Sequence, residues 1–393
     1  MKNICTGKAR TLCAAENKQR DSNLELYRII VMLLIVAHHY VVNSGLIGEG
    51  SPIYNDPMSG ASLFLLAFGA FGKTGINCFV LISGYFMCQS RITAKKFAKL
   101  LGEVVFYDIL INVIFWATGY EPFTLTSFLK NILPFTTLTQ NFTGCYLVFF
   151  LFIPFLNILI QHLSRQQHLC LIALCSFTYI LMGTVPFFSV AMNYVSWFIV
   201  LYFIASYIRL YPEKIFERTG LWGGLSLLFI VLSLLSVLVC TWLGNKLGRF
   251  LSYTFVSDSN TLLAVATGLA TFLFFKNIKL KQNRFINMVS GTTFGVLLIH
   301  AAGDSMRKWL WKDVLQVTDM YGNKFMPLHA IGSVIGVFIF CSAIDLLRIN
   351  LIEKPLLGLW DDYYDCVKSR FVRLGEKLWA KKSEPAQETQ QDK

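Results

Sequence analysis

Charged residues are scarce in this sequence. They make up 15% of the 393 residues, whereas hydrophobic residues make up 55% and include 34 phenylalanines. The mean hydropathy of +0.54 lies far outside the balance of soluble globular domains. The composition therefore excludes a soluble domain and predicts an integral membrane protein. Because unpaired backbone groups are not tolerated in the apolar core of a bilayer, the long apolar runs predict helices.

Three further absences narrow the class. No disulfide scaffold is indicated, because six of the ten cysteines lie in or beside apolar runs, where cysteine acts as a small hydrophobic residue. The first 23 residues are polar and basic, and no small-residue cleavage site follows them, so we expect the first helix to be retained. No soluble second domain and no internal repeat is evident.

The apolar stretches predict an all-α fold, a polytopic bundle of about ten transmembrane helices. The two weakest stretches are separated only by Pro186 and a short polar break, so nine or eleven spans stay open. The ten stretches are 24–44, 62–88, 97–118, 144–161, 168–185, 191–211, 222–243, 260–276, 287–303 and 328–349.

The distribution of Lys and Arg supports this count. Ten spans with both termini cytoplasmic place 27 of the 35 basic residues on the cytoplasmic side and 7 on the other side, with Lys73 inside a span. Because the net charge of +12 is scattered at helix ends, nucleic-acid binding is disfavoured. We predict a cytoplasmic segment at 1–23, a transmembrane domain at 24–350 and a basic cytoplasmic tail with a disordered end at 351–393.

Four ionisable residues fall inside predicted spans, where a charged side chain costs roughly 2.5–3.5 kcal/mol. They are His39, Lys73, Asp108 and His300. At about 1.5 Å of rise per residue, Asp108 lies about 16 Å and His300 about 20 Å from the inner face. All four then fit one layer near the middle of the bilayer, which predicts a shared hydrated cavity. Mutual neutralisation of Lys73 and Asp108 is the alternative for those two.

The first predicted helix carries Arg28 and His39 on one face. Eleven residues separate them, which corresponds to about 20° from exact overlap and about 16 Å of rise. Glu25 lies one turn below Arg28, within ion-pairing reach. His38 points about 80° away, and we expect a structural role for it. No metal site is predicted, because ring nitrogens of adjacent histidines point apart and no carboxylate lies four residues away.

The stretch "LYRIIVMLLIVAHHY", with its Arg28-x10-His39 spacing, resembles the hallmark of the acyltransferase-3 family of membrane O-acyltransferases, particularly its surface-polysaccharide branch. Two positions depart from the family pattern, Cys145 and Leu297, where aromatic residues are more usual. Further similarities follow in the expected order: "GINCFVLISGYF" with Arg91, "GCYLVFFLFIPFLN", "LYFIASYIRLYP", "TTFGVLLIHAAG" and "EKPLL".

The resemblance implies transfer of an acyl group, usually acetyl, from cytoplasmic acyl-coenzyme A to a sugar hydroxyl of a cell-surface or exported polysaccharide. The protein would lie in the bacterial plasma membrane, with acetyl-coenzyme A as co-substrate, no bound cofactor and no nucleic-acid partner. The sequence leaves open the sugar, the acyl group and the oligomeric state.

The resemblance also implies roles for particular residues. His39 would be the catalytic base, and Arg28 would act with it on the donor side. The remaining candidates are Arg91, Ser83 and Gly84 for binding the donor, and Lys73, Asp108 and His300 for supporting the base or binding the acceptor.

Two mechanisms and two other classes stay open. A hydroxyl activated by His39 would attack the thioester directly, with the oxyanion met by Lys73, Ser83 or a backbone N–H. The alternative mechanism is a covalent acyl-histidine intermediate. The rival class is a proton-coupled transporter or lipid-linked glycan flippase, for which helices broken in matching halves are expected. A purely structural membrane protein would leave the buried charges unexplained.

Overall fold

The computed structural model describes residues 21–132, 141–185, 187, 188, 190 and 192–361. Within these ranges the chain forms helices and no strands, as the apolar runs predicted. The chain divides into two compact units, Met1–Ser342 and Ala343–Lys393, which are described separately. Helix α16 (Met326–Arg348) contributes residues to both. The predicted disordered end of the tail lies outside the described residues.

Seven helical segments in the described ranges are long and apolar enough to cross a membrane. They are α1 (Ser22–Val42), α3 with α4 (Gly60–Phe68 and Gly72–Met87), α5 (Ala94–Ala117), α7 (Phe142–His162), α8 to α9 (Arg165–Thr184), α11 (Thr219–Leu247) and the segment Met326–Asp361, which contains α16. An eighth is a bent pair, Arg284–His300 followed by Asp304–Val314 at 95°.

Two shorter apolar helices, α10 (Tyr194–Leu210) and α12 (Leu262–Asn277), complete the set. In the described ranges, each predicted apolar stretch thus corresponds to one helix or to consecutive helices, while the number of spans and the side on which each terminus lies stay predictions. The short elements are α2 (Pro52–Asn55), α6 (Leu125–Ile132), η2 (Ser176–Leu181), η3 (Lys214–Glu217), α13 (Arg284–Ser290), α14 (Thr293–His300), α15 (Asp304–Lys308), η4 (Trp309–Val314), η5 (Val317–Met320) and η6 (Ile349–Glu353).

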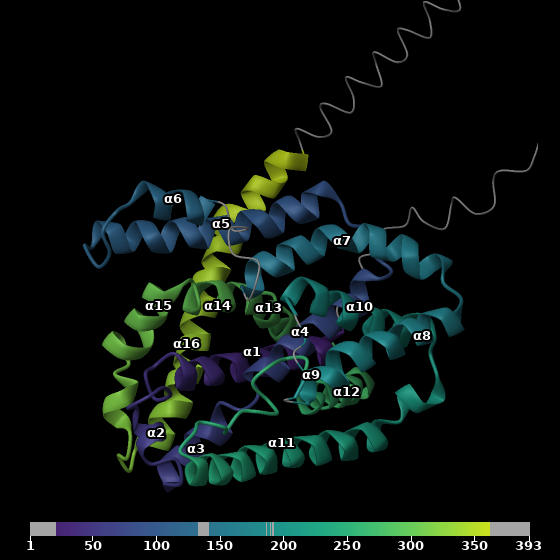
Figure 1. Ribbon diagram of the computed structural model, residues 1–393. Coiled ribbons are helices and arrows are strands. Elements are labelled where there is room, and N and C mark those ends of the chain that lie inside the picture. The colour runs from purple at the N-terminus through teal and green to yellow at the C-terminus, as the bar shows by residue number, and fades with distance from the viewer. Residues whose placement is uncertain (1–20, 133–140, 186, 189, 191, 362–393) are drawn as a thin grey trace, which may run out of the picture. The chain divides into compact units, whose positions relative to one another are not determined.

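Helix α1 is the packing centre of the first unit. It contacts α3, α4, α12, α13 and α14, which lie around it in Figure 1. Its buried side chains include Val31, Met32 and Val36, none of which is exposed to solvent. By contrast, α11 presents large apolar side chains such as Leu227 and Val239 outward, as expected for a helix that faces lipid.

Glycine allows α1 and α4 to approach closely. A Cβ atom placed on Gly72 would lie 2.2 Å from the Cβ atom of His38, so no side chain fits there. Gly75 faces Ile35 in the same way at 2.8 Å. Small residues at helix contacts are the usual means of close packing in membranes, where the hydrophobic effect does not drive helix association. The α1–α4 pair is therefore fixed around His38.

The second unit is described from Ala343 to Asp361, and a buried arginine organises it. The Arg348 side chain is 6% exposed, and its guanidinium contacts Asp345 at 2.7 Å and Glu353 at 2.8 Å. Glu353 belongs to the "EKPLL" stretch, so its function in the structure is to hold Arg348. Two carboxylates around one guanidinium satisfy a charge that would otherwise be expensive to bury.

Candidate active site

Two histidines from distant parts of the sequence form a hydrogen-bonded pair. Nδ1 of His39, near the end of α1, lies 2.9 Å from Nε2 of His300, the last residue of α14. His300 is completely buried, and its own Nδ1 lies 2.5 Å from the carbonyl oxygen of Val296. The structure thus brings together two of the four ionisable residues that the sequence placed in one layer.

The contact with Val296 determines how the protons are arranged in the neutral pair. A carbonyl oxygen can only accept, so Nδ1 of His300 carries the hydrogen and its Nε2 presents a lone pair. Nδ1–H of His39 must then donate to that lone pair. The remaining nitrogen, Nε2 of His39, is left unprotonated and has no hydrogen-bond partner among the residues described. His39 is therefore oriented with a basic nitrogen available for reaction.

The break after His300 brings an unexpected cation to the histidine pair. The segment turns by 95° between α14 and α15, at Gly303, whose φ of +113° favours glycine. Arg307 follows on α15, pairs with the exposed Asp304 at 3.2 Å, and acts electrostatically on both histidines. Its Nε–H is buried and lacks a hydrogen-bond partner in the described part of the chain. Arg307 is not among the predicted site residues, because the charge pattern places it in a loop on the non-cytoplasmic side.

Lys73 is the second cation near His39. It lies at the start of α4, half-buried, and its ammonium group donates a hydrogen bond of 2.8 Å to the hydroxyl of Tyr194. Its charge also acts on His39. The proposed neutralisation by Asp108 is wrong, because no ion pair joins the two residues in the described structure. Asp108 lies on α5, which packs against α14 and α7 and does not carry it to Lys73.

Arg28 lies on the His39 face of α1, toward the N-terminal end of that helix. Its guanidinium is 3.7 Å from the carboxylate of Glu25, which confirms the predicted ion pair. Glu25 also accepts a hydrogen bond from Ser290 of α13, so the carboxylate is held from two sides. Arg28 keeps 24% of its side chain exposed and acts electrostatically on Tyr146 of α7. The arginine is therefore anchored yet reachable by a ligand.

The other predicted donor-side residues have mainly structural contacts. The hydroxyl of Ser83 donates to the carbonyl of Phe79 at 2.9 Å and accepts from Tyr146 at 3.1 Å. Since its single hydrogen is already used, Ser83 has none left for an oxyanion. Gly84 allows close packing, because a Cβ atom there would lie 3.1 Å from that of Ala205 on α10. Arg91 follows α4 and is exposed. Donor binding by these residues stays a prediction.

His38 differs from His39 as expected. Its Nδ1 donates to the carbonyl of Gly69 at 2.7 Å, in the break between α3 and α4. This contact caps the carbonyl at the break and packs the ring against Gly72, which supports a structural role. Within the described ranges, no group of three or more His, Cys, Asp or Glu side chains could hold a metal ion.

These features define a multi-pass helical membrane protein with an oriented histidine pair beside two cations. A family model described as an acyltransferase domain matches residues 21–346, which is most of the chain. The protein therefore belongs to the acyltransferase-3 family and is a membrane acyltransferase. Comparisons with curated proteins and with solved structures gave no match.

Proposed function

We propose that the protein transfers an acyl group, acetyl in the first instance, from cytoplasmic acyl-coenzyme A to a sugar hydroxyl of a cell-surface or exported polysaccharide, in the bacterial plasma membrane. The observation that carries this proposal is the His300–His39 hydrogen bond. It leaves Nε2 of His39 as an oriented base, which is the group that a weakly acidic sugar hydroxyl requires.

The arrangement on α1 suits a long anionic donor. Arg28 and His39 lie on one face of the helix, about 16 Å apart along its axis. A guanidinium is the preferred side chain for binding phosphate, and Arg28 lies near the helix end that we assign to the cytoplasm. The donor would place its phosphates at that end, while its flexible arm carries the thioester toward His39.

The reaction follows from these positions. Nε2 of His39 takes the proton of the sugar hydroxyl as its oxygen attacks the thioester carbonyl carbon. The tetrahedral intermediate collapses, the carbon–sulfur bond breaks, and the departing thiolate receives the proton from His39. The products are the sugar ester and free coenzyme A, and His39 returns to its original state. His300 acts as a positioning residue, because it holds the proton on Nδ1 of His39 throughout.

Lys73 and Arg307 supply the positive charge that the oxyanion needs. The ammonium of Lys73 has three N–H groups, of which one binds Tyr194, so two can still donate. The buried Nε–H of Arg307 is a further donor. Donors fixed before the reaction stabilise a developing negative charge without reorganisation, which is a large contribution in sites of low dielectric. Lys73 and Arg307, and not Ser83, are therefore the proposed hydrogen-bond donors to the oxyanion.

Glycan analysis in the parent organism tests this function. Strains carrying wild-type protein, a deletion, His39→Ala or the control His162→Ala are compared by the mass of their surface and exported glycans. His162 is an exposed residue of α7 and is outside the proposed site. We expect the glycans of the deletion and His39→Ala strains, and not those of the wild type or the control, to be lighter by multiples of the mass of one acyl group. If His39→Ala keeps the acyl groups but stops glycan export, the protein is a carrier instead.

A further inference from the structure

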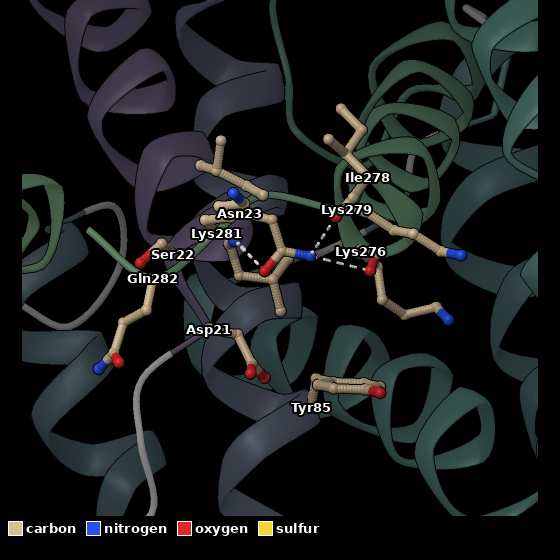
Figure 2. Close-up of a pocket in the computed structure, with 11 residues that line it drawn as sticks. Asp21, Ser22, Asn23, Tyr85, Lys276, Ile278, Lys279, Lys281 and Gln282 are labelled. Atoms are coloured by element: carbon tan, nitrogen blue, oxygen red, sulfur yellow. Dashed lines mark hydrogen bonds between the residues drawn. The ribbon is translucent and has the colours of Figure 1, made fainter.

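A polar cavity lies at the N-terminal end of α1, outside the histidine site. Its volume is about 760 Å³, and Figure 2 shows the side chains that surround it. One wall is the start of α1, from Asp21 to Leu24, and another is Tyr85 near the end of α4. The third is the end of α12, which contributes Lys276, with the connection that follows it, which contributes Lys279 and Lys281.

Hydrogen bonds join the start of α1 to the end of α12 and to the connection after it. The side-chain amide of Asn23 donates to three carbonyls, those of Phe275, Lys276 and Ile278, at 3.0, 3.0 and 3.1 Å. Figure 2 shows this amide between the two segments. Farther along, Ser22 accepts from the backbone N–H of Asn283 at 2.9 Å. The cavity wall is therefore built into the fold, and its lysines extend from a fixed backbone.

The cavity carries an excess of positive charge. Among the described residues that line it, Asp21 is the single acidic one, against three lysines. Within the described residues, none of these lysines forms an ion pair with a carboxylate. Lys276 donates a hydrogen bond of 2.8 Å to the side chain of Asn277, and Glu217 acts on it electrostatically without forming an ion pair. Three lysines around one polar cavity suit a ligand with several negative charges.

The cavity and the histidine site lie at opposite ends of α1. Asp21, at the N-cap of α1, precedes His39 by 18 residues, which is five full turns and about 27 Å of rise. Asp21 therefore lies on the same face of α1 as Arg28 and His39, closer to the N-terminal end of the helix. A ligand that enters this cavity with an anionic end can extend a flexible chain along that face.

We infer that this cavity binds the phosphate groups at the nucleotide end of the donor, a nucleoside bisphosphate. The inference rests on the proposed function and goes beyond it by separating two donor contacts. Lys276, Lys279 and Lys281 hold the nucleotide phosphates, and Arg28 contacts the donor closer to the reaction site. Anionic lipid headgroups carry the same phosphate chemistry, so the test distinguishes the two sources.

A binding measurement on the full chain tests the site without requiring catalysis. Adenosine 3′,5′-bisphosphate is titrated into protein held in nanodiscs of neutral phosphatidylcholine or of phosphatidylcholine with phosphatidylglycerol. The variant is Lys279→Glu with Lys281→Glu, and the matched control is Lys214→Glu with Arg218→Glu, two exposed residues outside the cavity. We expect saturable binding in neutral nanodiscs, weakened about tenfold or more by the cavity variant alone.

Two results of this titration overturn the inference. The first is equal nucleotide affinity in the wild type, the cavity variant and the control. The second is that the cavity binds lipid only. In that case phosphatidylglycerol binding depends on Lys279 and Lys281, and the nucleotide does not bind in neutral nanodiscs.

Transfer kinetics separate the inference from the proposed function. With acetyl-coenzyme A we expect the cavity variant to raise KM about tenfold at unchanged kcat. With S-acetylpantetheine, which lacks the nucleotide, the variant and the wild type should have the same KM. Equal KM values with acetyl-coenzyme A refute the cavity assignment and leave the function standing. Absence of transfer by the wild type with either donor refutes the function, whatever the nucleotide titration shows.

Discussion

Replacing His300 with leucine tests whether the histidine pair works as a unit. The change removes the acceptor that Nδ1–H of His39 uses at 2.9 Å, in a place where His300 is completely buried. Leucine fills a similar volume, so no water molecule can enter and accept the hydrogen bond in place of His300. An unsatisfied buried donor costs about 1–3 kcal/mol. Since about 1.4 kcal/mol corresponds to a factor of ten in rate, we expect kcat to fall roughly 10- to 100-fold.

The assay is thiol release from acetyl-coenzyme A by purified protein in the presence of the glycan acceptor. His300→Gln should recover much of the loss, because its side-chain oxygen can accept from His39. His168→Leu is the matched control: His168 is a buried histidine of α8, and it hydrogen-bonds the carbonyl of Phe203 at 3.0 Å. It should lower stability without changing kcat. A wild-type kcat in His300→Leu, or a raised KM for the glycan at unchanged kcat, refutes the positioning role.

Three other predictions follow from single contacts. Gly72→Ala should destabilise the fold by about 1–3 kcal/mol, because the new methyl group collides with His38; Gly102→Ala, which meets nothing within 4 Å, should be neutral in the same detergent melting assay. Arg307→Gln should lower kcat about tenfold or more, with partial recovery in Arg307→Lys, and an unchanged kcat would remove Arg307 from the site. Arg348→Ala leaves buried carboxylates without their cation and should cost about 3–5 kcal/mol by thermal melting; a loss below about 1 kcal/mol would contradict a buried ion-pair network.

Local features of the site were predictable from the sequence. The shared face of Arg28 and His39 follows from helical periodicity alone, and so does the contact between Glu25 and Arg28. The long apolar runs located the helices, because an apolar stretch in lipid must satisfy its own backbone. The separate role of His38 also followed, since its direction on α1 differs from that of His39.

Tertiary partners were not predictable in the same way. His39 and His300 are 261 residues apart, and nothing in either helix specifies that their rings meet. Lys73 binds Tyr194 instead of Asp108 because a hydroxyl on α10 lies within reach, which only packing determines. Depth in the bilayer placed ionisable residues in one layer, but depth alone does not determine which of them are neighbours.

The broken segment after His300 was missed for a different reason. Residues 287–303 were predicted as a single span that ends at Gly303, and the residues beyond it were assigned to a loop. The 95° turn depends on the positive φ of Gly303. In the sequence the one sign of this turn is a single glycine, which is too weak a signal to predict it. Because the turn redirects the chain, it also carries Arg307 from a predicted loop to the histidine pair.

Thioester turnover by the purified protein tests the central claim most directly. Wild-type protein in detergent is supplied with acetyl-coenzyme A and glycan, and free thiol and acylated glycan are measured together. We predict equal amounts of both products, and neither product from His39→Ala that is folded by the melting assay. Thiol release and glycan acylation that persist in folded His39→Ala would contradict the assignment of His39 as the catalytic base.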